Sequence, residues 1–307
     1  MDYKKYLEIA PEIQNAIDNN IPVVALESTI LSHGMPFPEN MEFAHKVEEV
    51  VRGEGAIPAT TAIIGGKLKV GLTPDELDIM CKADGIGKVS RRDVAVYLAT
   101  NKTGATTVAT TMLIASLAGL RVFATGGIGG VHRGAQETMD ISADLQELAH
   151  TPVAVIGAGC KSILDIGLTL EYLETMGVPV IGFNTDDFPA FYCRESGFGV
   201  DYNCPDAATA AKIMKTKWDL GLEGGMLIGN PIPKEYELDF DEMEKVINQA
   251  LELAKENNIR GKATTPFLLS RIKEITGGVS LASNLQLAYN NAKVAAQIAV
   301  EYAKISE

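Results

Sequence analysis

Cysteine is scarce in this chain, and the few cysteines are not paired along the sequence. The 307 residues include four, and no two of them form a Cys-x-x-Cys motif. This argues against a disulfide framework and against a cysteine-rich zinc site, because both depend on closely spaced cysteines. The sequence therefore predicts a reduced protein, and we expect a cytoplasmic location.

Long hydrophobic runs are absent as well. No apolar run approaches the length of about 18 residues that a membrane-spanning helix requires. The N-terminal segment MDYKKYLEIAPEI also lacks the long apolar core that is typical of a signal peptide. We expect no membrane partner.

Positive charge is in short supply. Lysine and arginine number 27 against 40 aspartates and glutamates, so the formal net charge is −13 at pH 7. A chain this acidic is a poor binder of nucleic acid or of an anionic membrane. An anionic ligand must therefore be held by a local basic group, and the densest one is KVSRRD at residues 88–93. Such a cluster is equally compatible with an exposed loop.

What the sequence does contain is an alternation of strand and helix patterns. Apolar runs typical of buried strands occur at residues 22–26, 121–125, 153–156, 178–183 and 224–229. Helical patterns occur at residues 3–19, 41–53, 104–120, 168–177, 207–220, 239–257 and 283–304. This order predicts an α/β fold, with a mostly parallel sheet covered by helices on both faces. No linker or internal repeat interrupts it, so we expect one domain spanning residues 1–307.

Two glycine-rich loops follow predicted strands, but neither has the spacing of a nucleotide-binding motif. In the first, residues 126–134, the third glycine of a dinucleotide motif would fall at His132. In the second, GAGCKS at residues 157–162, the glycine that precedes the lysine of a P-loop is missing. The glycines of the first loop still allow the backbone to approach a ligand closely.

Polar side chains follow the predicted strands at the points where they end. Glu27 follows residues 22–26, and Lys161 follows residues 153–156. In open α/β sheets, ligands bind outside the carboxyl ends of the strands. A lysine there can hold a phosphate, or it can lose its proton and attack a carbonyl carbon. A buried Glu–Lys ion pair and a solvent-exposed lysine are the structural alternatives.

Asp140 and Asp144 lie four positions apart in MDISAD. Their carboxylate oxygens suit Mg²⁺ or Mn²⁺, although the local pattern alone favours a helix N-cap role for Asp140. A carboxylic acid, a basic cluster, a metal-type carboxylate and an amine together fit a sugar phosphate with a divalent cation. From the residues alone, the sequence predicts a lyase or aldolase that forms a Schiff base on a sugar phosphate.

Longer motifs carry a resemblance over about residues 20–303. They read ALESTILSHGMPFPEN, KVSRRD, GATTVATTM, FATGGIGGVHRG, MDISADLQEL, GAGCKSILD, PAFY, GNPIP and GKATTPFLL. In this set and order, the chain resembles the pseudouridine-5′-phosphate glycosidase family, also called indigoidine synthase A-like. The resemblance implies a three-layer αβα sandwich. It also implies reversible cleavage of the carbon–carbon glycosidic bond of pseudouridine 5′-phosphate to uracil and ribose 5-phosphate.

The resemblance assigns roles to individual residues. Lys161 becomes the nucleophile that forms an imine with C1′ of the ribose, Glu27 the proton donor, and Asp140 the ligand of one Mn²⁺ per subunit, with Mg²⁺ or another divalent ion as alternatives. The family also implies a homotrimer. Substrate contacts are expected from the family motifs and from the glycine-rich loop: Lys88, Val108, Thr125, Gly126, Gly127, His132, Ser142, Ala143, Asp144 and Asn284.

Two other functions compete with this interpretation. One is a Schiff-base aldolase or lyase acting on another sugar phosphate, and the other is a sensor that binds a sugar phosphate without catalysis. Cys160, next to the lysine, is expected to be a small packed residue rather than a nucleophile.

Overall fold

The centre of the molecule is a run of parallel β-strands. The computed structural model describes residues 3–259 and 261–306. From one side of the run to the other, the strands are β3 (Ile57–Ile64), β2 (Val23–Leu26), β7 (Val122–Ala124), β9 (Ala154–Gly157), β13 (Met226–Gly229), β11 (Val180–Phe183) and β12 (Tyr202–Cys204). Each neighbouring pair in this run is parallel.

The sheet becomes mixed beyond β3. This strand pairs antiparallel with both β4 (Lys67–Val70) and β6 (Gly104–Thr106). Two further strands then extend the edge in parallel: β1 (Leu7–Ile9) beside β4, and β5 (Gly87–Val89) beside β6. The β3–β4 hairpin turns at Gly65-Gly66, both of which have positive φ angles, as its two-residue turn requires.

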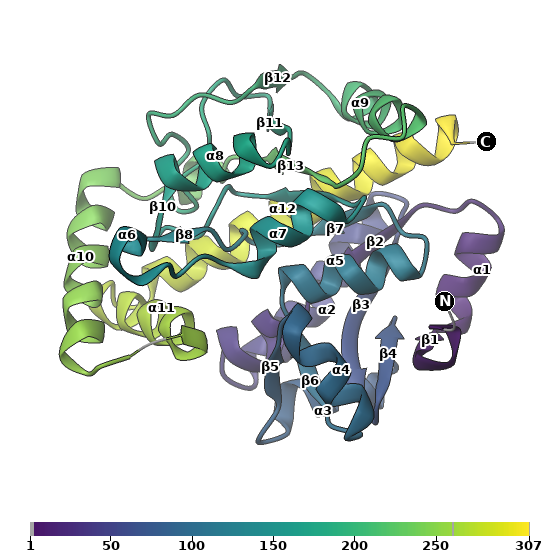
Figure 1. Ribbon diagram of the computed structural model, residues 1–307, viewed down its shortest axis with the longest axis horizontal. Helices are drawn as coiled ribbons and strands as arrows, with labels where there is room; N and C mark the ends of the chain where they lie inside the picture. Colours follow the sequence, from purple (N-terminus) through teal and green to yellow (C-terminus); the bar gives the residue numbers. More distant parts are fainter. Residues whose placement is uncertain (1–2, 260, 307) are drawn as a thin grey trace.

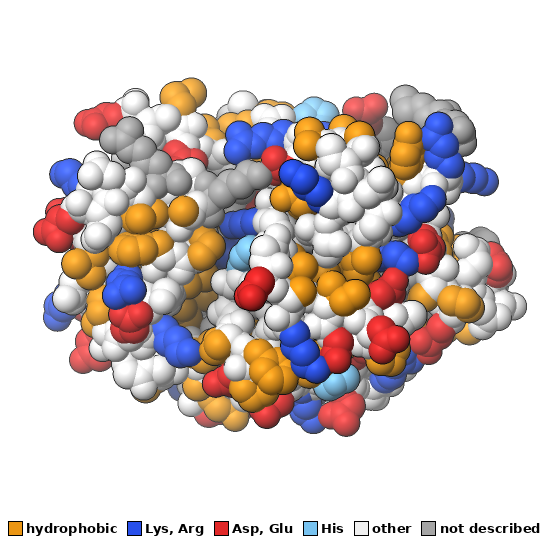
Figure 2. Space-filling view, turned by 90° about the horizontal axis from the view of Figure 1, so that it is seen from below, with side chains coloured by type: hydrophobic (Ala, Val, Ile, Leu, Met, Phe, Trp, Pro, Cys, Tyr) orange, Lys and Arg blue, Asp and Glu red, His pale blue; other side chains and the backbone are white. Residues whose placement is uncertain are grey.

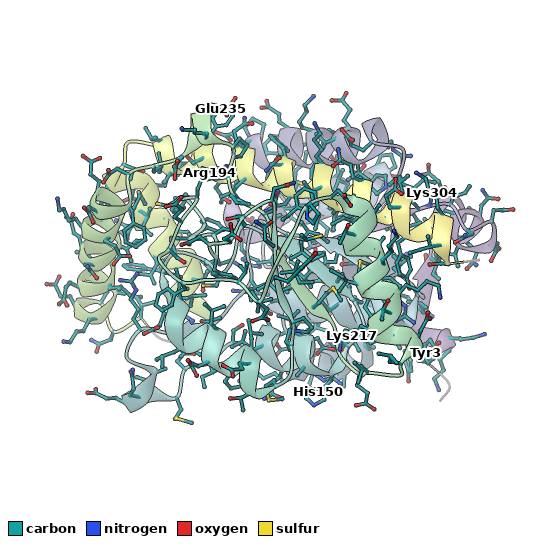
Figure 3. All side chains as sticks on the ribbon, turned by 90° about the horizontal axis from the view of Figure 1, so that it is seen from above. Tyr3, His150, Arg194, Lys217, Glu235 and Lys304 are labelled. Atoms are coloured by element: carbon teal, nitrogen blue, oxygen red, sulfur yellow. The ribbon has the colours of Figure 1, made fainter. Side chains whose placement is uncertain are left out.

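Helices cover both faces of the sheet, which confirms the predicted three-layer arrangement (Figure 1). On one face, α12 (Val279–Ile305) crosses β2, β7 and β9 and is flanked by α2 (Glu39–Gly53) and α9 (Ala207–Asp219) (Figure 3). The other face carries α5 (Val108–Leu117), α7 (Ala143–His150) and α8 (Ile166–Thr175). Because both faces are covered, all four residues of β2, β9 and β13 are buried.

Two helices form an arm at one end of the sheet, drawn in light green in Figure 1. We call α10 (Phe240–Glu256) and α11 (Thr264–Ile275) the helical arm; they pack against each other. Helix α11 also contacts α12 and the short helical turn Ile30–Gly34, which follows β2. The arm thereby reaches the carboxyl end of β2.

The remaining α-helices and β-strands of the described residues are α1 (Pro11–Asp18), α3 (Pro74–Lys82), α4 (Val94–Ala99), α6 (Ala135–Thr138), and the antiparallel pair β8 (Val131–His132) and β10 (Leu164–Asp165). Helix α3 begins with a complete capping box, in which Thr73 and Glu76 each bind the other's backbone N–H. Among the described residues, no helix is long and apolar enough to cross a membrane.

Candidate active site

A cavity of about 790 Å³ opens where the parallel strands end. Its lining includes Glu27 and Thr125, which directly follow β2 and β7, and Lys161 from the loop after β9, and the helical arm closes one side. Figure 2 shows a hollow in this face of the molecule, with basic side chains and a histidine beside it. The acidic chain therefore concentrates positive charge at the place where parallel sheets bind ligands.

Glu27 is the first residue after β2, and its carboxyl group lies in this cavity. The hydroxyl of Thr125, the first residue after β7, donates a hydrogen bond to Glu27 Oε1. Burial raises the pKa of Glu27 above its ordinary value, and the nearby Lys161 and Lys88 oppose this effect. A buried carboxyl group that keeps its proton at higher pH is suited to act as a general acid.

Lys161 extends from the loop after β9 towards the loop after β7. Its Nζ donates a hydrogen bond to the carbonyl of Gly127, and its backbone N–H binds the carbonyl of Ile128 at 3.0 Å. Gly159 has φ +79°, and a Cβ there would lie 1.9 Å from the carbonyl oxygen of Pro189. The glycine before Cys160 is thus required for the chain to turn and bring the lysine to the cavity.

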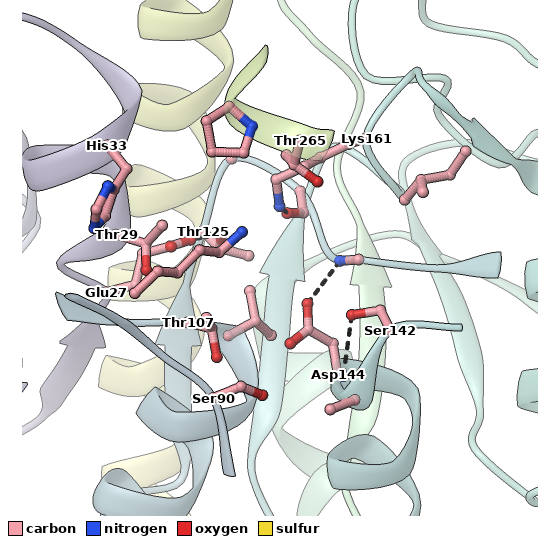
Figure 4. A pocket seen from close by; sticks show the side chains of 18 of the residues that line it. Glu27, Thr29, His33, Ser90, Thr107, Thr125, Ser142, Asp144, Lys161 and Thr265 are labelled. Carbon is pink, nitrogen blue, oxygen red and sulfur yellow. Dashed lines mark hydrogen bonds between the residues drawn. The ribbon is translucent and has the colours of Figure 1, made fainter. Parts of the chain in front are cut away.

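Asp144 ties the glycine-rich loop to the start of α5, and Figure 4 shows it beside Ser142, the residue that caps its own helix. One carboxylate oxygen accepts the N–H of Ala109 at 2.9 Å, and the other accepts the N–H of Gly129 at 2.8 Å. The N-cap of α7 is Ser142, whose hydroxyl accepts the N–H of Asp144 at 3.3 Å. The N-cap alternative for Asp140 is therefore wrong, because Ser142, two residues later, occupies the N-cap position.

Basic groups line another side of the cavity. Lys88 is half-buried, and its charge acts on Glu27, His33 and His132. Burial and Lys88 lower the pKa of His132, while Asp140 opposes them. Arg91 also faces the cavity and pairs at 2.6 Å with Glu147, a carboxylate whose side chain is 0% exposed. These groups provide an environment that favours a phosphate.

The donor set around Asp140 limits the kind of metal ion that it could hold. Among the described residues, no three His, Cys, Asp or Glu side chains come together as a metal-binding group. Asp140 is half-buried, it lines the cavity, and its carbonyl accepts the N–H of His132 at 3.0 Å. A single carboxylate fits a hard ion that keeps most of its water ligands, such as Mg²⁺ or Mn²⁺.

Arg133 connects the helical arm to the loop that carries Lys161. Its guanidinium group binds both carboxylate oxygens of Glu244 in α10, at 2.6 and 2.8 Å. It also donates to the carbonyl of Ser162 at 3.2 Å. The arm is therefore fixed against the residue that directly follows Lys161.

The structure brings all the site residues predicted from the sequence to one cavity, although their roles stay predictions. Its lining includes Glu27, Lys88, Val108, Thr125, Gly126, Gly127, His132, Asp140, Ser142, Ala143, Asp144, Lys161 and Asn284. Cys160 is fully buried, and burial raises its pKa to about 12, so it is not a reactive thiolate.

Sequence reasoning missed a second group of lining residues, which come from the turn after β2, from α11 of the helical arm and from the short turn that precedes α11. They are Ile30, His33, Gly261, Thr265, Pro266 and Leu269. Two of the long motifs contain them, ALESTILSHGMPFPEN and GKATTPFLL, but nothing in the local pattern indicates that these segments meet.

Comparisons with known proteins show the family of the chain. Residues 12–301 match the family model described as indigoidine synthase A like protein. The chain is 60% identical over 305 residues to a Clostridium botulinum protein named pseudouridine-5′-phosphate glycosidase, covering 99% of each. It is also 60% identical over 302 residues to a Petrotoga mobilis protein of the same name, covering 98% of this chain and 99% of that one.

Two solved structures have a similar fold. One is the prealnumycin C-glycosynthase AlnA in complex with ribulose 5-phosphate, with a TM-score of 0.91, 39% identity and 98% of each chain covered. The other is an indigoidine synthase A-like protein from Thermotoga maritima, with a TM-score of 0.88, 36% identity, and 97% of this chain and 96% of that one covered.

Proposed function

This chain belongs to the indigoidine synthase A-like family, and from that premise we propose that it is a pseudouridine-5′-phosphate glycosidase. The proposed reaction is the reversible cleavage of the C–C glycosidic bond of pseudouridine 5′-phosphate to uracil and ribose 5-phosphate. One observation supports it above the others: an amine, a carboxyl group with a raised pKa and a basic wall face a single cavity.

The chemical difficulty is that the base leaves through carbon. A carbanion on the ring is a poor leaving group, so C5 must gain a proton as the bond breaks, and a nitrogen atom on C1′ must donate its lone pair to the sugar carbon. In the proposed cleavage, the C1′–O4′ bond breaks with its electron pair going to O4′, which takes up a proton, and the neutral amine of Lys161 bonds to C1′ and gives up one proton. The bond from C1′ to C5 of the base then breaks, an imine forms between C1′ and Lys161, and Glu27 gives its proton to C5. Water hydrolyses the imine and releases ribose 5-phosphate.

The remaining lining residues are assigned to substrate binding. Lys88 is proposed to hold the phosphate as a charged donor, and His132 is proposed to contact the phosphate or the ribose through the N–H of its neutral ring. Contacts with ribose and base are assigned to Val108, Thr125, Gly126, Gly127, Ser142, Ala143, Asp144 and Asn284. Asp144 in addition keeps the glycine-rich loop in place through its two backbone contacts.

Asp140 is proposed to hold one Mn²⁺, or another hard divalent ion, that is mostly ligated by water. When bound, such an ion supplies positive charge to the phosphate-binding side of the cavity. We also propose a homotrimer, which analytical ultracentrifugation tests directly.

The decisive experiment uses the synthetic direction. The protein is incubated with uracil, ribose 5-phosphate and Mn²⁺, and pseudouridine 5′-phosphate is measured by chromatography with mass detection. We expect product with the wild type, less when metal is omitted, and none above background with Lys161→Ala. A wild type that binds ribose 5-phosphate but makes no product overturns the proposal, and so does a fully active Lys161→Ala variant.

A second candidate is a lysine Schiff-base lyase or aldolase acting on another sugar phosphate. It is favoured by the similarity to a C-glycosynthase that was solved with ribulose 5-phosphate. Borohydride trapping of a pentose phosphate on Lys161 without any product from uracil supports this candidate. Binding of ribose 5-phosphate without a trapped adduct instead supports a non-catalytic sensor.

A further inference from the structure

His33 lies in the turn Ile30–Gly34, which follows β2 and Glu27, and its ring lines the cavity. Among the described residues, its Nε2 atom has no hydrogen-bond partner although it is buried. A backbone hydrogen bond with Ile86 raises the pKa of the ring. Because Nε2 is the nitrogen without a partner, we assign the proton of the neutral ring to Nδ1, which leaves the free lone pair on Nε2.

The surroundings of His33 favour this neutral form. Burial and the positive charge of Lys88 both lower the pKa of the imidazole below its ordinary value, against the smaller effect of Ile86. A neutral Nε2 is a hydrogen-bond acceptor, which repels the oxygens of a phosphate and pairs with an N–H group. His33 thus differs from a phosphate ligand in its chemistry.

The turn that carries His33 is held in place from several sides. The side chain of Asn40 donates to the carbonyls of Leu31 and Cys81, both at 2.8 Å. The hydroxyl of Ser32 donates to the carbonyl of Met80 at 2.7 Å. A ring fixed in this way can present one acceptor in a defined direction, as selective recognition requires.

The position of His33 points to the base rather than the sugar. Figure 4 shows His33 and Lys161 on opposite sides of the site, with Glu27 and Thr125 between them. Apolar residues join His33 in the lining: Ile30 from the same turn, and Pro266 and Leu269 from the helical arm. Apolar walls with one acceptor suit a flat heterocycle that carries an N–H donor.

We propose that Nε2 of His33 accepts a hydrogen bond from a ring N–H of the uracil base, and that this contact selects the base. The assignment rests on the proposed function, because a base that receives a proton from Glu27 must lie against that residue. His33 is then a specificity-determining residue, while Lys161 and Glu27 react with the sugar and the base carbon.

The test compares uracil, 1-methyluracil and 3-methyluracil as bases in the synthetic direction. Two variants separate the two nitrogen atoms of the ring. His33→Asn keeps a donor for the Ile86 carbonyl and removes Nε2, whereas His33→Gln restores an acceptor near the Nε2 position. Borohydride trapping of ribose 5-phosphate on Lys161 without any base serves as the control for an intact sugar site.

We expect kcat/KM of the wild type to be at least about tenfold lower for one of the two methylated bases than for uracil, because that base lacks the N–H that His33 would bind. His33→Asn should lose most of this discrimination and still trap ribose 5-phosphate, and His33→Gln should restore part of it. Unchanged discrimination in His33→Asn overturns the assignment. It is also overturned if the variant raises KM for ribose 5-phosphate and lowers the rates with all three bases equally. A wild type without product from any base overturns the proposed function itself, and this assignment with it.

Discussion

At the scale of single residues, Glu27 combines an energetic cost with a chemical use. The first cause of its raised pKa is burial, and the charges of Lys161 and Lys88 only partly compensate. A carboxyl group that resists ionisation in the folded state is protonated more readily there than in the unfolded chain. The same burial therefore provides the acid and destabilises the folded protein once the group is ionised.

Glu27→Gln should separate these two effects. The variant cannot donate a proton, so we expect its rate of pseudouridine 5′-phosphate formation to fall by about 10²–10⁴-fold. Its stability relative to the wild type should rise with pH. With a folded pKa above the ordinary 4.5, the stability that Glu27 contributes is fully present below pH 4.5 and is lost as pH rises through the folded value.

The measurement is urea denaturation of both proteins from pH 4 to pH 8, together with the product assay. Glu27→Asp serves as the control because it keeps an ionisable group. The quantity to follow is the free energy of unfolding of Glu27→Gln minus that of the wild type. If this difference falls between pH 4 and pH 8, burial is not the dominant cause of the raised pKa of Glu27.

The sequence predicted the reacting groups better than it predicted the walls around them. Glu27 and Lys161 were placed together because carboxyl ends of parallel strands share one edge of a sheet. His33 and Pro266 were missed because they meet only through the packing of α11 against the turn after β2. Local patterns carry no information about such a contact.

At the scale of elements, helix α12 links the sheet to the site through one buried side chain. Asn291 is 0% exposed, and its amide nitrogen donates to the carbonyls of Thr125 and Gly126, at 2.8 and 3.1 Å. Its amide oxygen accepts a hydrogen bond from Asn230, the residue after β13, at 2.9 Å. One amide thus holds the ends of two strands in fixed positions.

Asn291→Ala should destabilise the protein by about 2 kcal/mol or more, because it leaves buried polar groups without partners. Activity should also fall, since the loop that begins at Thr125 loses its support. Asn290→Ala is the matched control: the side chain of Asn290 makes a single hydrogen bond, at 3.1 Å, to the carbonyl of Pro231. Urea denaturation of the two variants should differ clearly, and equal losses would contradict the role given to Asn291.

Several elements differed from their sequence patterns for identifiable reasons. The helix predicted over residues 3–19 begins at Pro11, because Leu7–Ile9 instead pairs with β4. The helix predicted over residues 104–120 begins at Val108, since residues 104–106 form β6 against β3. In both cases an available sheet edge outweighed a helical pattern of apolar residues.

At the scale of the whole molecule, the cysteines report on the integrity of the fold. Cys81, Cys160, Cys193 and Cys204 are all buried. Burial raises the pKa values of all four, to about 11 for Cys81 and about 12 for Cys160 and Cys193. Thiolate is therefore rare and protected in the folded state.

We expect Ellman's reagent to label the native protein slowly and all four cysteines rapidly in denaturant. Activity should survive incubation with the reagent under native conditions. A Cys160→Ala variant should retain activity, because we expect Cys160 to be a packed residue that takes no part in the reaction. Rapid native labelling with parallel loss of activity would contradict this expectation.

The helical arm has a consequence for protein engineering. In the sequence, the arm lies between β13 and α12, after the segments that carry Glu27 and Lys161. Its cavity-facing residues, Thr265, Pro266 and Leu269, can therefore be randomised while the reacting groups keep their own scaffold. Such a library must preserve the ion pair between Arg133 and Glu244, because it attaches the arm to the rest of the molecule. The chain thus separates the part that carries out chemistry from a part that can be redesigned for new ligands.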